Sequence, residues 1–199
     1  APQRWRFSVE DYFRLAEVGL LAPEDRTELI DGEIIKMAPI GAPHCGIVNR
    51  INRIFVIRFG DDVVVHVQNS VWLDPWSLPQ PDVTLLRSRE DFYGDALPEP
   101  GDVLLVVEVA DSSLAFDHRT KVPLYARCGV PEVWVVSVPH DHVEVYRDLE
   151  GGTYASRRVL RRGESVAPAA FPTLEIPVQD IVGPAQPGRA RKRETTSDP

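Results

Sequence analysis

Two acidic residues lie at positions where a charge is costly, and they are the first candidates for chemistry. Asp82 follows Pro81 at the start of a predicted strand, and Glu108 lies inside the aliphatic run Val-Val-Glu-Val-Ala. A carboxylate among buried aliphatic side chains is unfavourable unless it is paired with a cation or bound to a metal ion. Two carboxylates together with a backbone carbonyl suit a hard cation such as Mg²⁺.

Lys121 lies on the predicted helix that follows the strand of Glu108. Its long side chain can reach back toward that carboxylate, which would complete a site of two acids and one base. The alternative interpretation is a structural ion pair between Glu108 and an Arg or Lys, with Asp82 capping a turn. The pattern of residues alone leaves both interpretations open.

The elements that position these residues begin with a helix and a hairpin. Residues 8–18 have amphipathic spacing, and Ser8 is suited to cap the helix. An Asp-Gly turn at residues 31–32 separates the apolar runs 27–30 and 33–37, which is a strong hairpin signal.

A long helix is predicted next, over residues 43–59. Its apolar stripe is expected to consist of four isoleucines at steps of four, three and three residues: Ile47, Ile51, Ile54 and Ile57.

Strands dominate the rest of the domain, interrupted by one crossover helix. The predicted strands are 63–67, 70–73, 82–86, 103–109, 132–138, 142–146 and 154–159, the last of which is expected to pair with its predecessor. The nearly unbroken aliphatic run of 103–109 suits a central strand buried on both faces. Residues 116–128 predict a helix that Pro123 should kink or delay. The order of these elements predicts an α/β domain.

Length and composition place limits on the protein class. A chain of 199 residues suits one domain, predicted over 1–183, and residues 184–199 have the composition of a disordered tail. The longest apolar run is too short to span a bilayer, so we expect no membrane partner. No secretion signal is visible, and the two scattered cysteines make no disulfide framework, so we expect a cytoplasmic protein.

The formal net charge of -8 argues against a protein that holds nucleic acid mainly through surface charge. Two considerations weaken this objection. Catalytic carboxylates are acidic by necessity, and a bound cation reverses their local charge. Net charge also conceals how the charges are distributed over the surface.

Several short motifs stand in an order that is specific to one family, although each motif alone is weak. They are Thr-Glu-Leu-Ile-Asp-Gly-Glu around Glu28, His44, Gln68-Asn69, Pro-Gln-Pro-Asp-Val at 79–83, Val-Val-Glu-Val at 106–109, Lys121 with Tyr125, and Gly-Val-Pro-Glu-Val-Trp at 129–134. Over residues 5–182 the chain resembles the Uma family of restriction endonucleases, a branch of the PD-(D/E)XK nuclease superfamily.

The resemblance implies a restriction-endonuclease-like α/β fold, with a central mixed β-sheet flanked by helices. It implies that Asp82 and Glu108 are the two acids of the motif. The motif lysine belongs two residues after the second acid, but Ala110 stands there. In the family this lysine is moved to the following helix, where Lys121 matches it.

The resemblance also implies roles for two residues near the N-terminus. Glu28 matches an acid that assists metal binding, and His44 matches a histidine near the same pocket. The alternatives are that Glu28 pairs on the surface with Arg26 or Arg50, and that His44 is an exposed residue at a helix end.

Four further residues keep simpler interpretations. Lys121 would be a solvated helix lysine if the site were absent, and Gln68 either lines the pocket or satisfies a strand edge. Tyr125 and Trp134 are expected to be packing residues.

The function implied by this set is a metal-dependent endonuclease that hydrolyses phosphodiester bonds in DNA, active as a homodimer. Asp82, Glu108 and the Val109 carbonyl would hold Mg²⁺ or Mn²⁺. Lys121 would orient the attacking water or stabilise the transition state, and His44 would transfer a proton. The alternatives are a non-catalytic nuclease-fold module that binds nucleic acid or a protein, and a metal-dependent hydrolase with another substrate.

Overall fold

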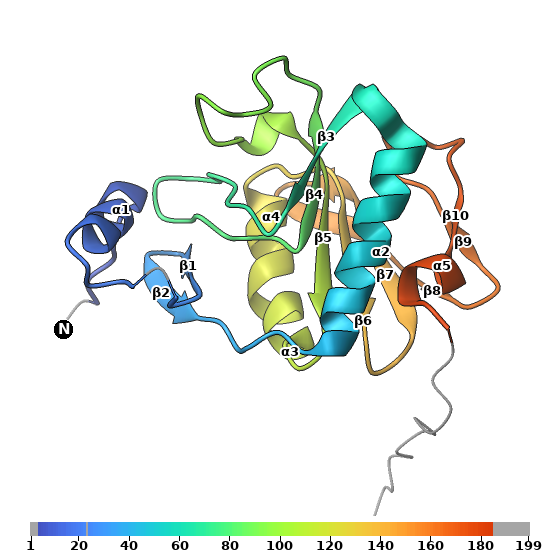
Figure 1. Ribbon diagram of the computed structural model, residues 1–199, viewed down its shortest axis with the longest axis horizontal. Coiled ribbons are helices and arrows are strands. Elements are labelled where there is room, and N and C mark those ends of the chain that lie inside the picture. The colour runs from blue at the N-terminus through green and yellow to red at the C-terminus, as the bar shows by residue number, and fades with distance from the viewer. Residues whose placement is uncertain (1–3, 23, 185–199) are drawn as a thin grey trace, which may run out of the picture.

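The computed structural model describes residues 4–22 and 24–184, and at its centre lies one six-stranded sheet (Figure 1). In spatial order the strands are β3 (Val63–Val67), β4 (Val83–Arg87), β5 (Val103–Ala110), β6 (Val133–Ser137), β7 (His142–Glu150) and β8 (Thr153–Arg161). β5 and β6 run parallel and the other neighbouring pairs run antiparallel. The predicted mixed sheet is therefore confirmed.

Helices cover both faces of the sheet (Figure 1). One face packs against α2 (Ala42–Phe59) and α5 (Val178–Val182), and the other against a helical stretch made of α3 (Leu114–Phe116), η3 (Asp117–Lys121) and α4 (Val122–Arg127). Alternate residues of β5 enter the two cores, with Val107 and Val109 facing α2 and Val106 facing α4. By the same alternation Glu108 points toward the α4 side.

The crossover helix contains one wide turn immediately before its proline. η3 is a π-helix, and Pro123 follows it in the first turn of α4. A proline lacks the N–H of the α-helical ladder and its ring clashes with the carbonyl four residues earlier, so a widened turn accommodates it. The predicted helix is thus present over 114–127, and the proline produces a π-turn.

The N-terminal helix and hairpin form as predicted, as α1 (Val9–Glu17), β1 (Thr27–Ile30) and β2 (Glu33–Lys36). Ser8 and Asp11 make the expected capping box. The hairpin is attached to the main body where Leu78 N–H donates to the Leu29 carbonyl at 2.8 Å. This attachment brings β1, and with it Glu28, beside the central sheet.

The predicted strand 70–73 is wrong. This segment forms an irregular loop in which Val71 N–H donates to the Pro79 carbonyl and Leu73 N–H donates to the Ser77 carbonyl. Val71 and Leu73 are nevertheless buried. The alternation of apolar residues therefore reflects burial of a folded-back loop, which a strand pattern does not distinguish.

The apolar stripe predicted for α2 is partly wrong. Ile47 and Ile51 are buried, but Ile57 is 67% exposed, and Phe55 and Phe59 occupy the core. At about 100° per residue, steps of four from Ile47 rotate the buried face toward the phenylalanines and leave Ile57 on the opposite side.

Short elements near the C-terminal end were not predicted, namely β9 (Ser165–Val166), β10 (Ile176–Pro177) and α5. The 3₁₀ turns η1 (Gly60–Asp62) and η2 (Pro100–Asp102) precede β3 and β5. The predicted disordered tail, 184–199, lies outside the described residues from 185 onward. No helix in the described ranges is both long and apolar enough to cross a membrane.

Candidate active site

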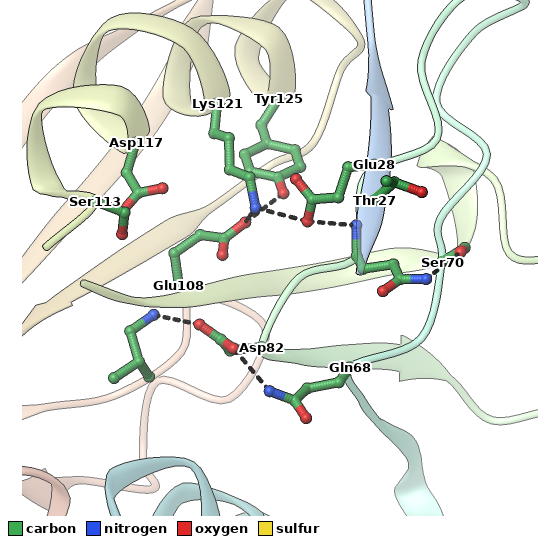
Figure 2. Close-up of polar contacts among 12 residues, drawn as sticks. Thr27, Glu28, Gln68, Ser70, Asp82, Glu108, Ser113, Asp117, Lys121 and Tyr125 are labelled. Atoms are coloured by element: carbon green, nitrogen blue, oxygen red, sulfur yellow. Dashed lines mark hydrogen bonds and ion pairs between the residues drawn. The ribbon is translucent and has the colours of Figure 1, made fainter. Parts of the chain in front are cut away.

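Lys121 is a buried cation that bridges two buried acids from distant parts of the chain. Its Nζ donates to Glu28 Oε1 at 3.0 Å and to Glu108 Oε1 at 3.1 Å. The side chains of these three residues are between 1% and 4% exposed. Glu28 comes from β1, Glu108 from β5 and Lys121 from η3, so tertiary packing assembles the group (Figure 2).

Two further donors hold the acids of this group. Tyr125, one turn after Lys121, donates its hydroxyl to Glu108 Oε1 at 2.5 Å. The backbone N–H of Gln80 donates to Glu28 Oε1 at 3.0 Å. The same oxygen of each carboxylate therefore receives both of its recorded hydrogen bonds. The other oxygen of Glu28, Oε2, is buried with no hydrogen-bond partner among the described residues.

Asp82 lies at the start of β4 on the opposite side of β5 from the Glu108 side chain in the close-up (Figure 2). Its Oδ2 accepts from the backbone N–H of Val109 at 2.8 Å and lies 3.0 Å from His44 Nε2. Its Oδ1 accepts from Gln68 Nε2 at 3.2 Å. Gln68 directs its side chain here from a left-handed backbone conformation, with φ of 53°.

A single pocket connects the two acidic groups. Its volume is about 110 Å³, and its wall includes Glu28, Asp82, Glu108 and Lys121. A buried water needs roughly 15 Å³ measured in this way, so the pocket has room for several waters or a hydrated ion. The remaining lining residues that carry polar side chains are Arg26, His44, Gln80, Asp111, Ser112, Ser113 and Asp117.

The acids of the pocket differ in their electrostatic surroundings. Burial raises the pKa of Glu108 well above its usual value, and the charges of Asp117, Asp82 and Glu28 add to this effect against the opposing charge of Lys121. The pKa of Asp117 is also raised, mainly by burial.

Lys121 and Asp82 keep their charges. Burial disfavours the Lys121 ammonium, but the charges of Glu108, Glu28 and Asp117 outweigh burial and raise its pKa. Burial raises the pKa of Asp82, but its contacts with His44 and the Val109 N–H outweigh this and lower it. The pocket therefore holds more acids than its one buried lysine neutralises.

Comparison with known proteins identifies the family. The sequence model of Uma2, described as "Putative restriction endonuclease", matches residues 9–179. The chain belongs to the Uma2 family. Among solved structures, it is similar to the crystal structure of a "putative nuclease belonging to DUF820" from Anabaena variabilis, with a TM-score of 0.69 and 14% identity over 88% of this chain and 97% of that chain. At this identity the likeness shows that the two chains share a fold. No curated protein sequence matches the chain.

In this Uma2 chain the predicted site residues meet around one pocket. Glu28, His44, Asp82, Glu108 and Lys121 all line it. Lys121 is not a solvated helix residue, and Glu28 is not paired with Arg26 or Arg50 on the surface. The side chain of His44 is only 12% exposed, so it is not a solvated helix end.

Three assignments take a different form from the sequence interpretation. The ion pair offered as an alternative for Glu108 is present, with Lys121 as its partner. Val109, whose carbonyl remains a predicted ligand, lines the pocket and also donates its N–H to Asp82. Tyr125 is buried as predicted but also donates to Glu108, whereas Trp134 is a packing residue against Phe55.

The donor set of the Uma2 pocket fits a divalent cation. No cluster of three or more His, Cys, Asp and Glu side chains in metal-binding geometry occurs within residues 4–22 and 24–184. Mg²⁺, however, usually keeps several waters and is held by only one or two carboxylates. The excess of acids, the raised pKa of Glu108 and the unpartnered Glu28 Oε2 all favour an added positive charge.

Two residues of this pocket were missed by the sequence analysis. Asp117 is buried, lies four residues before Lys121 on the same helical stretch, and accepts from Ser113 Oγ at 2.7 Å. The helical i, i+4 spacing of Asp117 and Lys121 was a signal available in the sequence. Gln80 lies between two prolines, and no local pattern indicates that its N–H holds Glu28.

Proposed function

We propose that this protein is a metal-dependent endonuclease that hydrolyses phosphodiester bonds in DNA. The observation that carries the proposal is the buried Lys121 between Glu28 and Glu108, on the wall of the pocket that also contains Asp82. A buried charge network is costly to maintain, and strongly perturbed acids in a pocket are typical of functional sites. Membership of the Uma2 family gives the reaction class.

Asp82 and Glu108, with assistance from Glu28, are the residues that would hold Mg²⁺ or Mn²⁺. When bound, such an ion polarises a phosphoryl oxygen and lowers the pKa of a coordinated water. Lys121 supplies a fixed positive charge that stabilises the negative charge developing on the phosphoryl oxygens. Because Tyr125 and Gln80 hold the two partner acids, the lysine is oriented before substrate binds.

The contact of His44 with Asp82 supports a role for this histidine in proton transfer. When its Nε2 donates to Asp82, the Nδ1 atom keeps its lone pair and is the basic atom of the ring. We propose that His44 accepts or returns a proton during hydrolysis while Asp82 orients the ring. The proposal includes a homodimer, because two copies of the site would cleave the two strands of DNA. It also includes a cytoplasmic location.

Cleavage of plasmid and single-stranded DNA with Mg²⁺ or Mn²⁺ tests the proposal. We expect Asp82→Ala and Lys121→Ala to lower the rate at least about 100-fold, the loss typical for removal of a stabilising group from the transition state. Lys36→Ala is the matched control, because Lys36 is an exposed lysine paired with Asp25 and does not line the pocket. Equal rates in wild type and Asp82→Ala would reject the site.

Calorimetric titration with Mn²⁺ separates the endonuclease from a non-catalytic nuclease-fold module. The enzyme should bind the ion, and Asp82→Ala should bind it more weakly. Absence of binding at millimolar Mn²⁺, together with retained DNA binding, would favour the module. Cleavage of other phosphodiesters but not of DNA would favour a hydrolase with another substrate.

A further inference from the structure

A second buried glutamate lies in the same row of the sheet as Glu108. Glu108 on β5 is aligned with Val135 on β6, and Val135 is aligned with Glu144 on β7. Aligned residues of neighbouring strands point to the same face, so both glutamates face the α4 side, roughly 10 Å apart. The side chain of Glu144 is only 3% exposed.

Donors surround the Glu144 carboxylate within its own sheet. Oε1 lies 3.1 Å from His142 Nε2, and Oε2 accepts from the Tyr146 hydroxyl at 2.7 Å and from Arg157 Nη2 at 2.9 Å. Burial alone would raise the pKa of Glu144, but these contacts and the charge of His118 outweigh burial and lower it to about 2. Glu144 is therefore a fixed negative charge on this face.

One contact to Glu144 comes from the helical stretch above the sheet. His118, in η3, places Nε2 3.0 Å from Glu144 Oε2, and its ring lies 6.4 Å from that of Tyr146. His118 Nε2 is within ion-pair distance of Glu144 Oε2 but makes no aligned hydrogen bond to it. Three residues later, the same π-turn places Lys121 on Glu108.

In the first part of the helical stretch, Leu114 is a partly buried apolar residue that packs against the core. Within the described segment 114–121, the fully buried side chains are the two charged ones, Asp117 and Lys121. The apolar anchors begin in α4, with Val122, Leu124 and Tyr125. The π-turn therefore lies between two apolar attachments, and its own contacts with the sheet are polar.

We infer that His118 is a positioning residue for Lys121: its contact with Glu144 fixes one side of the π-turn to β7, so that the lysine on the other side meets Glu28 and Glu108. The two contacts hold the turn at two points across three strands. Loss of the His118 contact removes the attachment of the turn to β7, and the ammonium then samples more than one position although Leu114 and α4 still pack against the core.

Nuclear magnetic resonance of the lysine ammonium groups tests this directly. The sequence has three lysines, Lys36, Lys121 and Lys192, so ¹⁵N-lysine labelling gives few signals, and Lys121→Arg assigns the one of interest. Because Lys121 is 1% exposed, its ammonium hydrogens should exchange slowly with solvent. In His118→Ala we expect this signal to move and its hydrogen exchange to accelerate about tenfold or more.

Three variants make the test specific. His118→Arg keeps a cation that can reach Glu144 and should restore most of the wild-type signal. Arg119→Ala alters an exposed neighbour on the same turn and should leave the signal unchanged. Glu144→Gln removes the charge from the strand side and should reproduce the His118→Ala spectrum. An unchanged Lys121 signal in folded His118→Ala or Glu144→Gln would overturn the inference.

The cleavage readout rests on the proposed function and is kept separate. We expect kcat in His118→Ala to fall about tenfold while KM for DNA stays unchanged, because the substrate-binding surface is intact and only the lysine is misplaced. Recovery of kcat in His118→Arg would support positioning. If wild type does not cleave DNA, the proposed function fails, while the ammonium spectra still decide the inference.

Discussion

Glu108 and Glu144 lie in one row of the sheet, two strands apart and both almost fully buried, yet their surroundings act on them in opposite directions. Glu144 receives contacts from two histidines, a tyrosine and an arginine, and its pKa falls to about 2. Burial raises the pKa of Glu108, and three other acids raise it further against the charge of one lysine.

The difference shows that burial of a carboxylate does not by itself define a role. Around Glu144 the protein supplies enough donors to satisfy the charge, which is the arrangement of a structural anchor. Around Glu108 the protein leaves negative charge in excess, which is the surrounding expected for the proposed cation site. The comparison predicts that substitutions at the two positions have opposite effects on stability.

Glu108→Gln gives the largest expected effect on function. We expect cleavage to fall about 1000-fold, because the variant loses a carboxylate of the proposed metal site. Stability should change in the opposite sense. A carboxyl whose pKa is raised by folding destabilises the native state increasingly as pH rises above its unfolded value, so the stability of Glu108→Gln relative to wild type should increase between pH 5 and pH 8.

Thermal unfolding at pH 5 and pH 8 measures this effect. The stability of Glu108→Gln relative to wild type should be greater at pH 8 than at pH 5, because the higher pH favours ionisation of the buried wild-type carboxyl. A variant that is less stable than wild type by the same amount at both pH values would contradict the assigned electrostatics.

Glu144→Gln should show the reverse behaviour. A carboxyl whose pKa is lowered by folding from 4.5 to about 2 stabilises the native state above about pH 4.5, and this contribution disappears as pH falls toward 2. The shift corresponds to about 3 kcal/mol at neutral pH. Denaturant unfolding of wild type and Glu144→Gln should differ by this order at pH 7 and converge near pH 2. A difference that is independent of pH would show that the charge of Glu144 contributes little.

The tyrosines that serve the two glutamates provide a matched pair with smaller effects. Tyr125 donates to Glu108 at 2.5 Å and Tyr146 donates to Glu144 at 2.7 Å. Tyr125→Phe leaves Glu108 with Lys121 as its hydrogen-bond donor. We therefore expect the free energy of unfolding to fall by about 2 kcal/mol and cleavage to become slower. Tyr146→Phe leaves Glu144 with contacts from His142 and Arg157, so we expect the free energy of unfolding to fall by about 1 kcal/mol.

Unfolding free energies and cleavage rates of the two Phe variants are the measurement. Since each change deletes one hydroxyl, lost packing is similar in both. Equal losses of stability and unchanged cleavage in both variants would show that the surroundings of Glu108 and Glu144 do not differ in the way described above.

Local sequence patterns determined the elements that depend on neighbouring residues. Ser8 with Asp11 caps the first helix, Asp31-Gly32 turns the hairpin, and the aliphatic run of β5 becomes a central strand. These features follow from backbone conformation and from burial along one element, which neighbouring residues report. Segment 70–73 and Ile57 were misjudged because burial in a loop and the rotation of a helix face depend on what packs against them.

The candidate site divides in the same way. The residue types and order of Glu28, Asp82, Glu108 and Lys121 were readable from the sequence and from its family resemblance. The balance of charge among them could not be predicted from the sequence. It depends on the spatial distances between residues that lie up to 93 positions apart in the chain, as Lys121 and Glu28 do. Only the tertiary structure placed Lys121 between two acids, brought the Gln80 N–H to Glu28 and set His118 over Glu144, since electrostatic energy depends on separation and burial in space.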